Sequence, residues 1–307
     1  MTDALYGDNG FYRASGAPAR HFRTSAHASP LWADAIAELV RRADAALGAA
    51  EELTVVDVGA GGGELLTALA ATAPPRWRLI GVDVAPRPDA LPTGVEWRES
   101  VPDGFNGLLV AVEWLDVVPV DVVERVPDGI RLVEVSDSGA ERLGGRVDTP
   151  GAAWLQRWWS LHEVGDRAEI GTTRDDAWAD AVGHLHRGAA LCVDYAVDPH
   201  RDVAGTLTGY RDGRQVLPVP DGSCDLTAHV LIESCADAAE VDRSRVMSQR
   251  DALQTLGVRA ERPAYDGDAR SYLRELQQTS EAAELLDRDG LGAFTWLVQA
   301  KGIDLPL

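Results

Sequence analysis

The stretch VVDVGAGGGELLTAL, residues 55–69, joins an apolar run to a helical pattern through four glycines within five residues. The β-branched start is typical of a buried strand, and the apolar spacing after Glu64 is typical of an amphipathic helix. Because glycine has no Cβ atom, the backbone of the bend can pass close to something that a side chain would block. The stretch therefore predicts a strand, a tight bend with a neighbour close to its backbone, and a helix.

Segments typical of strands and helices alternate around this bend. Ser29 and Pro30 predict the start of a helix that Gly48 ends, and a second helix is expected over 64–73. The predicted strands are rich in valine and leucine, as expected of a sheet covered on both faces, and they span 53–58, 77–84, 95–98, 108–114 and 189–195. This order predicts an α/β fold with a doubly wound, Rossmann-like sheet.

The alternation stops between residues 120 and 187, which we interpret as an insertion. Two runs typical of strands flank a turn at 127–129 and predict a hairpin. The spacing of apolar residues in 152–164 predicts a core-facing helix. The face of this helix is expected to carry Trp154, Leu155, Trp158 and Leu161. Further along, we expect a hairpin near 206–219, helices near 246–256 and 271–286, and a last strand over 294–300.

Composition excludes several classes of function. The net charge of −20 leaves no basic surface for DNA or RNA, and an anionic membrane is disfavoured for the same reason. The three cysteines form no CxxC pair, so neither a disulfide framework nor a zinc site is expected, and we predict no metal site. The first residues lack the basic and apolar regions of a signal peptide, so we expect a cytoplasmic protein.

The glycine bend favours a cationic ligand over a phosphate. A dinucleotide fingerprint needs a small residue where this chain has Glu64, and that carboxylate would repel a pyrophosphate at the start of the helix. S-adenosyl-L-methionine carries its positive charge beside the reactive carbon, and Asp83 stands where an acid can accept hydrogen bonds from ribose hydroxyls. Such an acid also serves nicotinamide cofactors, but the glycines, Asp57 and Asp83 together favour S-adenosyl-L-methionine over these and over a merely structural turn. The predicted cofactor residues are Asp57, Gly59, Ala60, Gly61, Gly63 and Asp83.

Two acids lie at or just beyond the end of the strand predicted over 108–114. Glu113 and Asp116 come at its carboxyl end, where ligands bind in open α/β sheets, and together they could hold a cation. The alternative is that both are solvated loop acids. Asp194 and His229 are weaker candidates, since a structural role explains either residue as well.

Several stretches of the chain resemble one known family, in the same order. HFRTSAHASPLWADAIAELV (21–40), VVDVGAGGGELL (55–66), LLVAVEWLDVVPV (108–120) and ALCVDYA (190–196) are similar to blocks of the MidA-like (DUF185) S-adenosylmethionine-dependent methyltransferases. The mitochondrial member of this family is the complex I assembly arginine methyltransferase. This chain differs at Gly62 and Glu64 in the loop, at Val112, and at Ala26 and His27.

The resemblance implies a class I methyltransferase domain over 51–307 with an insertion at 120–187, preceded by an N-terminal arm and helix over 1–50. It implies S-adenosyl-L-methionine as cofactor and an arginine-containing protein as partner, with Glu113 and Asp116 as the catalytic residues that hold the guanidinium. Two alternatives stay open. One is a small-molecule methyltransferase; the other, motivated by the departures in the loop, is a non-catalytic assembly or scaffold protein that keeps the fold.

Overall fold

The computed structural model describes residues 1–13, 29–49, 51–201, 204–265 and 267–307. Its described residues group into two compact units. The larger unit lies within Arg23–Val112, Val182–Val193 and Val241–Leu307, and the smaller unit within Met1–Phe22, Glu113–Ala181 and Asp194–Glu240. The quoted block at 21–40 falls partly outside the described residues, so its first eight positions are not placed.

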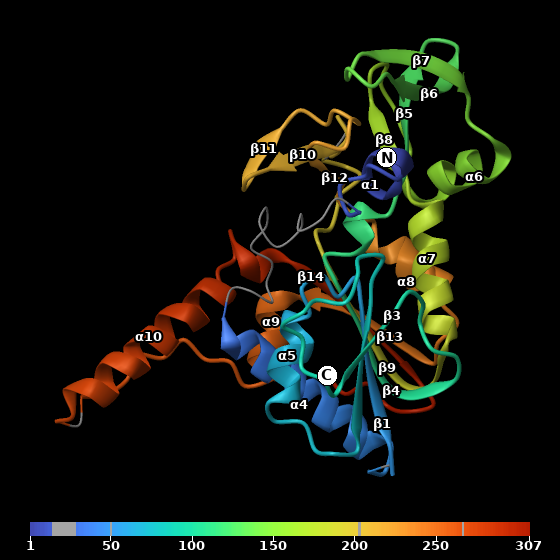
Figure 1. Ribbon diagram of the computed structural model, residues 1–307. Helices are drawn as coiled ribbons and strands as arrows, with labels where there is room; N and C mark the ends of the chain where they lie inside the picture. The colour runs from blue at the N-terminus through green and yellow to red at the C-terminus, as the bar shows by residue number, and fades with distance from the viewer. Residues whose placement is uncertain (14–28, 50, 202–203, 266) are drawn as a thin grey trace. The chain divides into compact units, whose positions relative to one another are not determined.

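The larger unit is built on a seven-stranded sheet in the order β13-β14-β9-β4-β1-β2-β3 (Figure 1). Strands β1, β2, β3, β4 and β9 pair in parallel, and β13 pairs antiparallel with β14. Chain order runs outward from β1 to β3 and then resumes on the other side of β1, which confirms the predicted doubly wound sheet. Its strands are β1 (Leu53–Val58), β2 (Trp77–Val82), β3 (Val95–Arg98), β4 (Phe105–Val112), β9 (Leu185–Asp194), β13 (Arg243–Ser248) and β14 (Thr295–Lys301).

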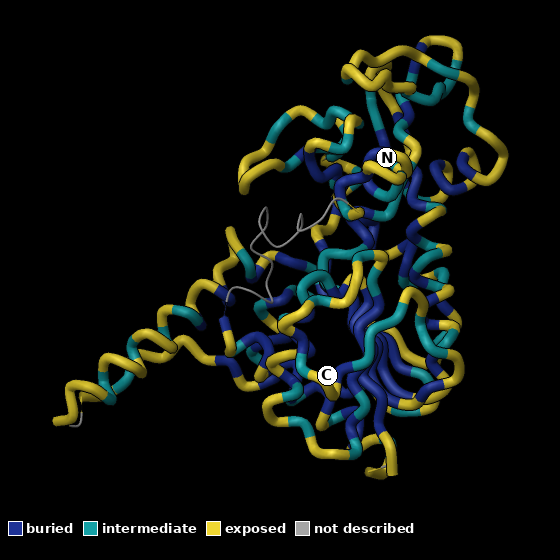
Figure 2. The backbone as a smooth tube through the Cα atoms, viewed as in Figure 1, coloured by how far each residue is buried: buried dark blue, intermediate teal, exposed yellow. Residues whose placement is uncertain are grey.

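Four helices pack on one face of this sheet: α4 (Pro30–Ala46), α5 (Glu64–Ala70), α9 (Gln249–Thr255) and α10 (Ala269–Leu285). A short 3-10 helix, η2 (Leu291–Ala293), precedes β14. The indole N–H groups of Trp32 and Trp296 both donate to Gln249 Oε1, at 3.1 and 3.0 Å, so a buried amide satisfies both donors. Figure 2 shows the sheet as the most deeply buried part of this unit, whereas the first half of α10 is exposed.

Two glycines set the register of the central strands at their amino ends. Gly107 on β4 pairs with Thr54 on one side and with Gly188 of β9 on the other. A Cβ atom at Gly107 would overlap the Thr54 carbonyl oxygen, and one at Gly188 would overlap the Gly107 carbonyl oxygen. Both residues also have left-handed φ angles, of 148° and 140°. Only glycine therefore fits at positions 107 and 188, where these three neighbouring strands pair.

The smaller unit contains two antiparallel sheets. The four-stranded sheet has the order β7-β6-β5-β8, and the three-stranded sheet has the order β11-β10-β12. The strands are β5 (Asp121–Val126), β6 (Gly129–Val135), β7 (Glu141–Arg146), β8 (Arg167–Ile170), β10 (Thr208–Arg211), β11 (Arg214–Val216) and β12 (Asp225–Thr227). The helices are α1 (Thr2–Tyr6), η1 (Leu115–Val117), α6 (Thr149–Trp158), α7 (Thr172–Gly183) and α8 (Ile232–Ala238).

Several predicted elements need correction. The hairpins at 121–135 and 208–216 are confirmed, but the helix expected to include Leu161 ends at Trp158, and Leu161 packs into the core from the loop that follows. The helix predicted over 246–256 begins only at Gln249, because Val246 to Ser248 complete the ladder of β13 with β14. Strand β4 begins and ends earlier than predicted, so Glu113 and Trp114 lie beyond it. In the part of the chain that is described, no helix is long and apolar enough to cross a lipid bilayer.

Candidate functional site

The bend after β1 is held against the end of β2 by backbone hydrogen bonds. The N–H groups of Gly59 and Ala60 donate to the Val82 carbonyl, at 2.9 and 3.2 Å. The Gly61 N–H donates to Asp83 Oδ2 at 2.8 Å. Since β1 and β2 are parallel neighbours, these bonds place the glycines and Asp83 together at the carboxyl edge of the sheet.

The three glycines that follow Ala60 have different physical roles. A Cβ atom at Gly61 would meet no heavy atom within 4 Å, although its φ of +55° is left-handed. A Cβ atom at Gly63 would overlap Leu91 Cδ1, so the packing requires glycine at this position. At Gly62 the overlap would be with the flexible end of Glu64, which can move. Gly61 is therefore the position whose open side can receive a ligand.

Three carboxylates surround the bend. Asp57 is 5% exposed, and burial raises its pKa to about 8, with the charges of Asp83 and Glu64 adding to the effect. Burial also raises the pKa of Asp83, while the N–H groups of Ala85 and Gly61 oppose that shift. A cation placed here would relieve this repulsion, whereas a phosphate would increase it. The ammonium and sulfonium charges of S-adenosyl-L-methionine fit this bend, and its residues could hold that cofactor.

The second group of acids belongs to the smaller unit. Glu113 directly follows β4 in the left-handed conformation, with φ of +50°, which is uncommon for a residue with a side chain. Asp116 is 5% exposed, and its Oδ1 atom has no hydrogen-bond partner among the described residues. Burial raises the pKa of Asp116 well above its ordinary value, and the charges of Asp194, Asp225 and Glu113 raise it further. We call these four acids, Glu113, Asp116, Asp194 and Asp225, the carboxylate cluster.

Asp194 fixes the turn that carries Asp116. Its Oδ2 atom accepts the N–H groups of Leu115 and Asp116, at 3.0 and 3.2 Å, and its Oδ1 atom accepts the N–H of Tyr195 at 2.9 Å. The carboxylate of Asp194 therefore organises backbone, which makes it a positioning residue for the turn that carries Asp116.

Arg174 on α7 supplies positive charge to the same region. Its guanidinium is buried and donates to the carbonyls of Asp116, Ala228 and His229, at 2.7, 2.9 and 2.6 Å. These bonds tie the turn at Asp116 to the 228–229 segment. Its charge also opposes the upward shift of the pKa of Asp116.

The N-terminal arm contributes aromatic groups to this unit. The Tyr12 hydroxyl donates to Asp225 Oδ2 at 2.8 Å, and the Tyr6 hydroxyl donates to the Val117 carbonyl at 3.1 Å. The two rings stack with centroids 5.5 Å apart. Residues 6 and 12 therefore connect the arm to β12 and to the turn that follows Asp116.

The structure thus gathers the predicted residues into two sets. Asp57, Gly59, Ala60, Gly61, Gly63 and Asp83 lie together in the larger unit, and Glu113, Asp116 and Asp194 lie together in the smaller one. Arg174, Asp225 and Tyr12 were not identified from the sequence. His229 is exposed and stacks on Tyr195, with ring centroids 5.9 Å apart. No motif marks Arg174, because its backbone acceptors, which also include the Val118 carbonyl at 3.4 Å, are distant in the sequence.

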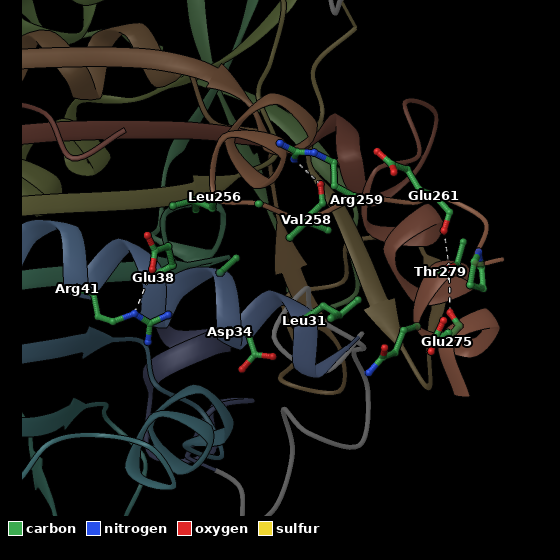
Figure 3. A pocket seen from close by; sticks show the side chains of 14 residues that line it. Leu31, Asp34, Glu38, Arg41, Leu256, Val258, Arg259, Glu261, Glu275 and Thr279 are labelled. Atoms are coloured by element: carbon green, nitrogen blue, oxygen red, sulfur yellow. Dashed lines mark hydrogen bonds and ion pairs between the residues drawn. The ribbon is translucent and has the colours of Figure 1, made fainter. Parts of the chain in front are cut away.

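A separate pocket of about 530 Å³ lies in the larger unit between α4, the 256–263 segment and α10 (Figure 3). None of the predicted cofactor residues lines it. Some of its polar groups pair with one another: Arg41 with Glu38 at 3.1 Å, and the Thr279 hydroxyl with the Glu261 carbonyl at 3.0 Å. Within the described residues, no group of three or more histidine, cysteine or acidic side chains could hold a metal ion.

Comparisons with known proteins give a consistent result. A family model described as "Putative S-adenosyl-L-methionine-dependent methyltransferase" matches residues 76–248. A crystal structure of a superfamily member from Burkholderia thailandensis, bound to S-adenosyl-homocysteine, is similar with a TM-score of 0.81 at 26% identity, covering 100% of this chain and 88% of that one. A native structure from the same organism gives 0.80 at 26% identity, covering 99% and 86%. No curated protein matches the sequence.

Proposed function

The chain belongs to this family of S-adenosyl-L-methionine-dependent methyltransferases, and we propose that it methylates an arginine side chain of a protein. The cofactor is S-adenosyl-L-methionine, for which the bend at Gly61 and the acids around it are suited. The structure neighbour bound to S-adenosyl-homocysteine, the demethylated form of that cofactor, supports the same assignment.

The observation that carries the arginine proposal is the Oδ1 atom of Asp116, which has no hydrogen-bond partner among the described residues. A buried carboxylate oxygen without a protein partner costs free energy, and a donor from a ligand would relieve that cost. The remaining members of the carboxylate cluster add negative charge around it. A guanidinium offers five N–H donors and a permanent positive charge, so it would satisfy both needs together.

The side chains divide the work as follows. When bound, the cofactor would supply a methyl group on a positively charged sulfur that can leave as a neutral thioether. The guanidinium stays protonated in water, so the enzyme must orient one nitrogen for attack and take a proton from it. We assign Glu113 to orient that nitrogen, and Asp116 to take the proton that leaves it as the carbon–nitrogen bond forms. The raised pKa of Asp116 makes its ionised form a stronger proton acceptor, and an incoming cation favours that form.

The proposal is tested by amino-acid analysis of labelled proteins. Purified protein is incubated with methyl-tritiated cofactor and with an extract of source cells that lack the gene, and the proteins are then hydrolysed in acid. We expect radioactivity in methylated arginine, and we expect Glu113→Gln to abolish it. Radioactivity in another amino acid, or only in small molecules, would show that arginine is not the acceptor. No transfer by a protein that binds the cofactor would favour the scaffold alternative.

A further inference from the structure

Tyr195 and His229 form an exposed, stacked pair beside the carboxylate cluster. Their ring centroids are 5.9 Å apart and the ring planes differ by 17°. Tyr195 is 41% exposed, although it directly follows the fully buried Asp194, and His229 is exposed as well. The pair therefore offers a partly exposed aromatic surface next to the buried Asp194.

The backbone of both residues is held in place. The Tyr195 N–H donates to Asp194 and the Tyr195 carbonyl accepts the Val230 N–H at 2.7 Å. The His229 N–H donates to Thr206 Oγ1 at 2.9 Å, and its carbonyl accepts from Arg174. The pair is therefore attached to the same two residues, Asp194 and Arg174, that fix Asp116.

The charges of the cluster reach the tyrosine ring. Besides burial, the negative charges of Glu113 and Asp116 raise the pKa of the Tyr195 hydroxyl. The Tyr195 hydroxyl therefore lies close enough to these two acids to feel their charge.

We propose that Tyr195 and His229 form a planar wall of the methyl-acceptor site that selects a guanidinium over an ammonium group. This inference rests on the proposed arginine acceptor. A guanidinium is flat and weakly hydrated, so it can stack on an aromatic face while its edge donates to carboxylates. An ammonium is compact and strongly hydrated, and it gains less from such a face.

The test compares two peptides on the full-length protein saturated with S-adenosyl-homocysteine. The probes are acetyl-Gly-Gly-Arg-Gly-Gly-amide and its lysine counterpart, and the readout is the ring resonance of His229 in NMR spectra of protein with labelled histidines. The chain has 7 histidines, so the spectrum of His229→Gln assigns this signal. We expect the arginine peptide to shift it with saturation, and the lysine peptide to bind at least about 5-fold more weakly.

Two variants at one position separate the aromatic face from its volume. Tyr195→Phe keeps the face and should retain arginine-peptide affinity within about 2-fold. Tyr195→Leu keeps most of the volume without the face and should weaken that affinity by about 5- to 30-fold, with a smaller effect on the lysine peptide. Retained binding of S-adenosyl-homocysteine shows that each variant is folded.

The outcomes distinguish the two proposals. If the arginine peptide binds and Glu113→Gln weakens it, but Tyr195→Leu binds as well as Tyr195→Phe, the wall is wrong and the arginine acceptor stands. If the wild-type protein binds S-adenosyl-homocysteine but neither peptide, the arginine acceptor itself is overturned. Equal affinity for the two peptides would refute the proposed selectivity.

Discussion

Replacing Gly61 by valine should remove cofactor binding while the protein stays folded. Gly61 has a φ of +55°, and its missing Cβ atom would point into open space. The strain of a left-handed residue with a side chain is about 1–2 kcal/mol, which corresponds to a drop in melting temperature of about 2–8 °C. No described protein atom lies within 4 Å of the added Cβ atom, so packing adds little at that point.

The loss of affinity follows from the same open space. If the cofactor occupies the region that the valine would fill, the overlap costs about 1.4–3 kcal/mol or more of binding free energy. The dissociation constant should therefore rise by about 10- to 100-fold. The assay is isothermal titration of S-adenosyl-homocysteine into both proteins, with melting temperatures measured on the same samples.

Gly104→Val is the matched control. Gly104 has a similar φ of +64°, its Cβ position is also open, and the residue lies in an exposed turn before β4. It should lose similar stability and keep wild-type affinity. Unchanged affinity in Gly61→Val, or an equal loss in Gly104→Val, would refute the assignment of the bend as the cofactor site.

Three further predictions follow from the acids and from Arg174. Glu113→Gln should bind S-adenosyl-homocysteine within about 3-fold of wild type but transfer methyl groups about 10²- to 10⁴-fold more slowly; full activity would remove Glu113 from catalysis. Burial raises the pKa of Asp57 to about 8, so the folded state binds more protons than the unfolded state between pH 4 and 8. The contribution of Asp57 to the free energy of unfolding therefore falls as pH rises, by up to about 1.4 kcal/mol per pH unit. Urea titrations across this range should show a shallower fall in Asp57→Asn, and identical slopes would contradict the shift. A lysine at position 174 cannot reach the carbonyls of Asp116, Ala228 and His229 together, so Arg174→Lys should lower the free energy of unfolding, measured by heat or urea, by about 2–5 kcal/mol. An unchanged melting temperature would show that these hydrogen bonds do not stabilise the fold.

The sheet, and the bend that brings the glycines beside Asp83, could be predicted because their signals are local. A continuous apolar run, closely spaced glycines and the acid after the next strand are all contained within about thirty residues. Strand ends were less accurate, because they depend on side-chain acceptors: Asp83 accepts the Ala85 N–H and ends β2 before the predicted boundary at 84. The start of α9 was misplaced since residues 246–248 are extended by pairing with β14, which no local pattern shows.

The grouping of the acids was predicted only in part. Glu113 and Asp116 were proposed together because they lie at the end of a strand, but the sequence does not show that Asp194 accepts three backbone N–H groups. Arg174 lies on a helix with many charged residues, and only the fold brings its guanidinium to the carbonyls of 116, 228 and 229. Tyr195 became a candidate because it is partly exposed and stacks on His229, and the sequence alone shows neither feature.

The paired glycines at the amino ends of β4 and β9 have a consequence for genetics. The register that sets Gly107 beside Gly188 also sets Val112 beside Val193, so it determines how the strand that leads to Glu113 is aligned with the strand that ends in Asp194. A one-residue slip would turn the side chains of either strand to the opposite face. A random mutagenesis screen for loss of methyl transfer should therefore recover alleles at codons 107 and 188, and mapping inactive alleles by proximity to the acids alone would miss them.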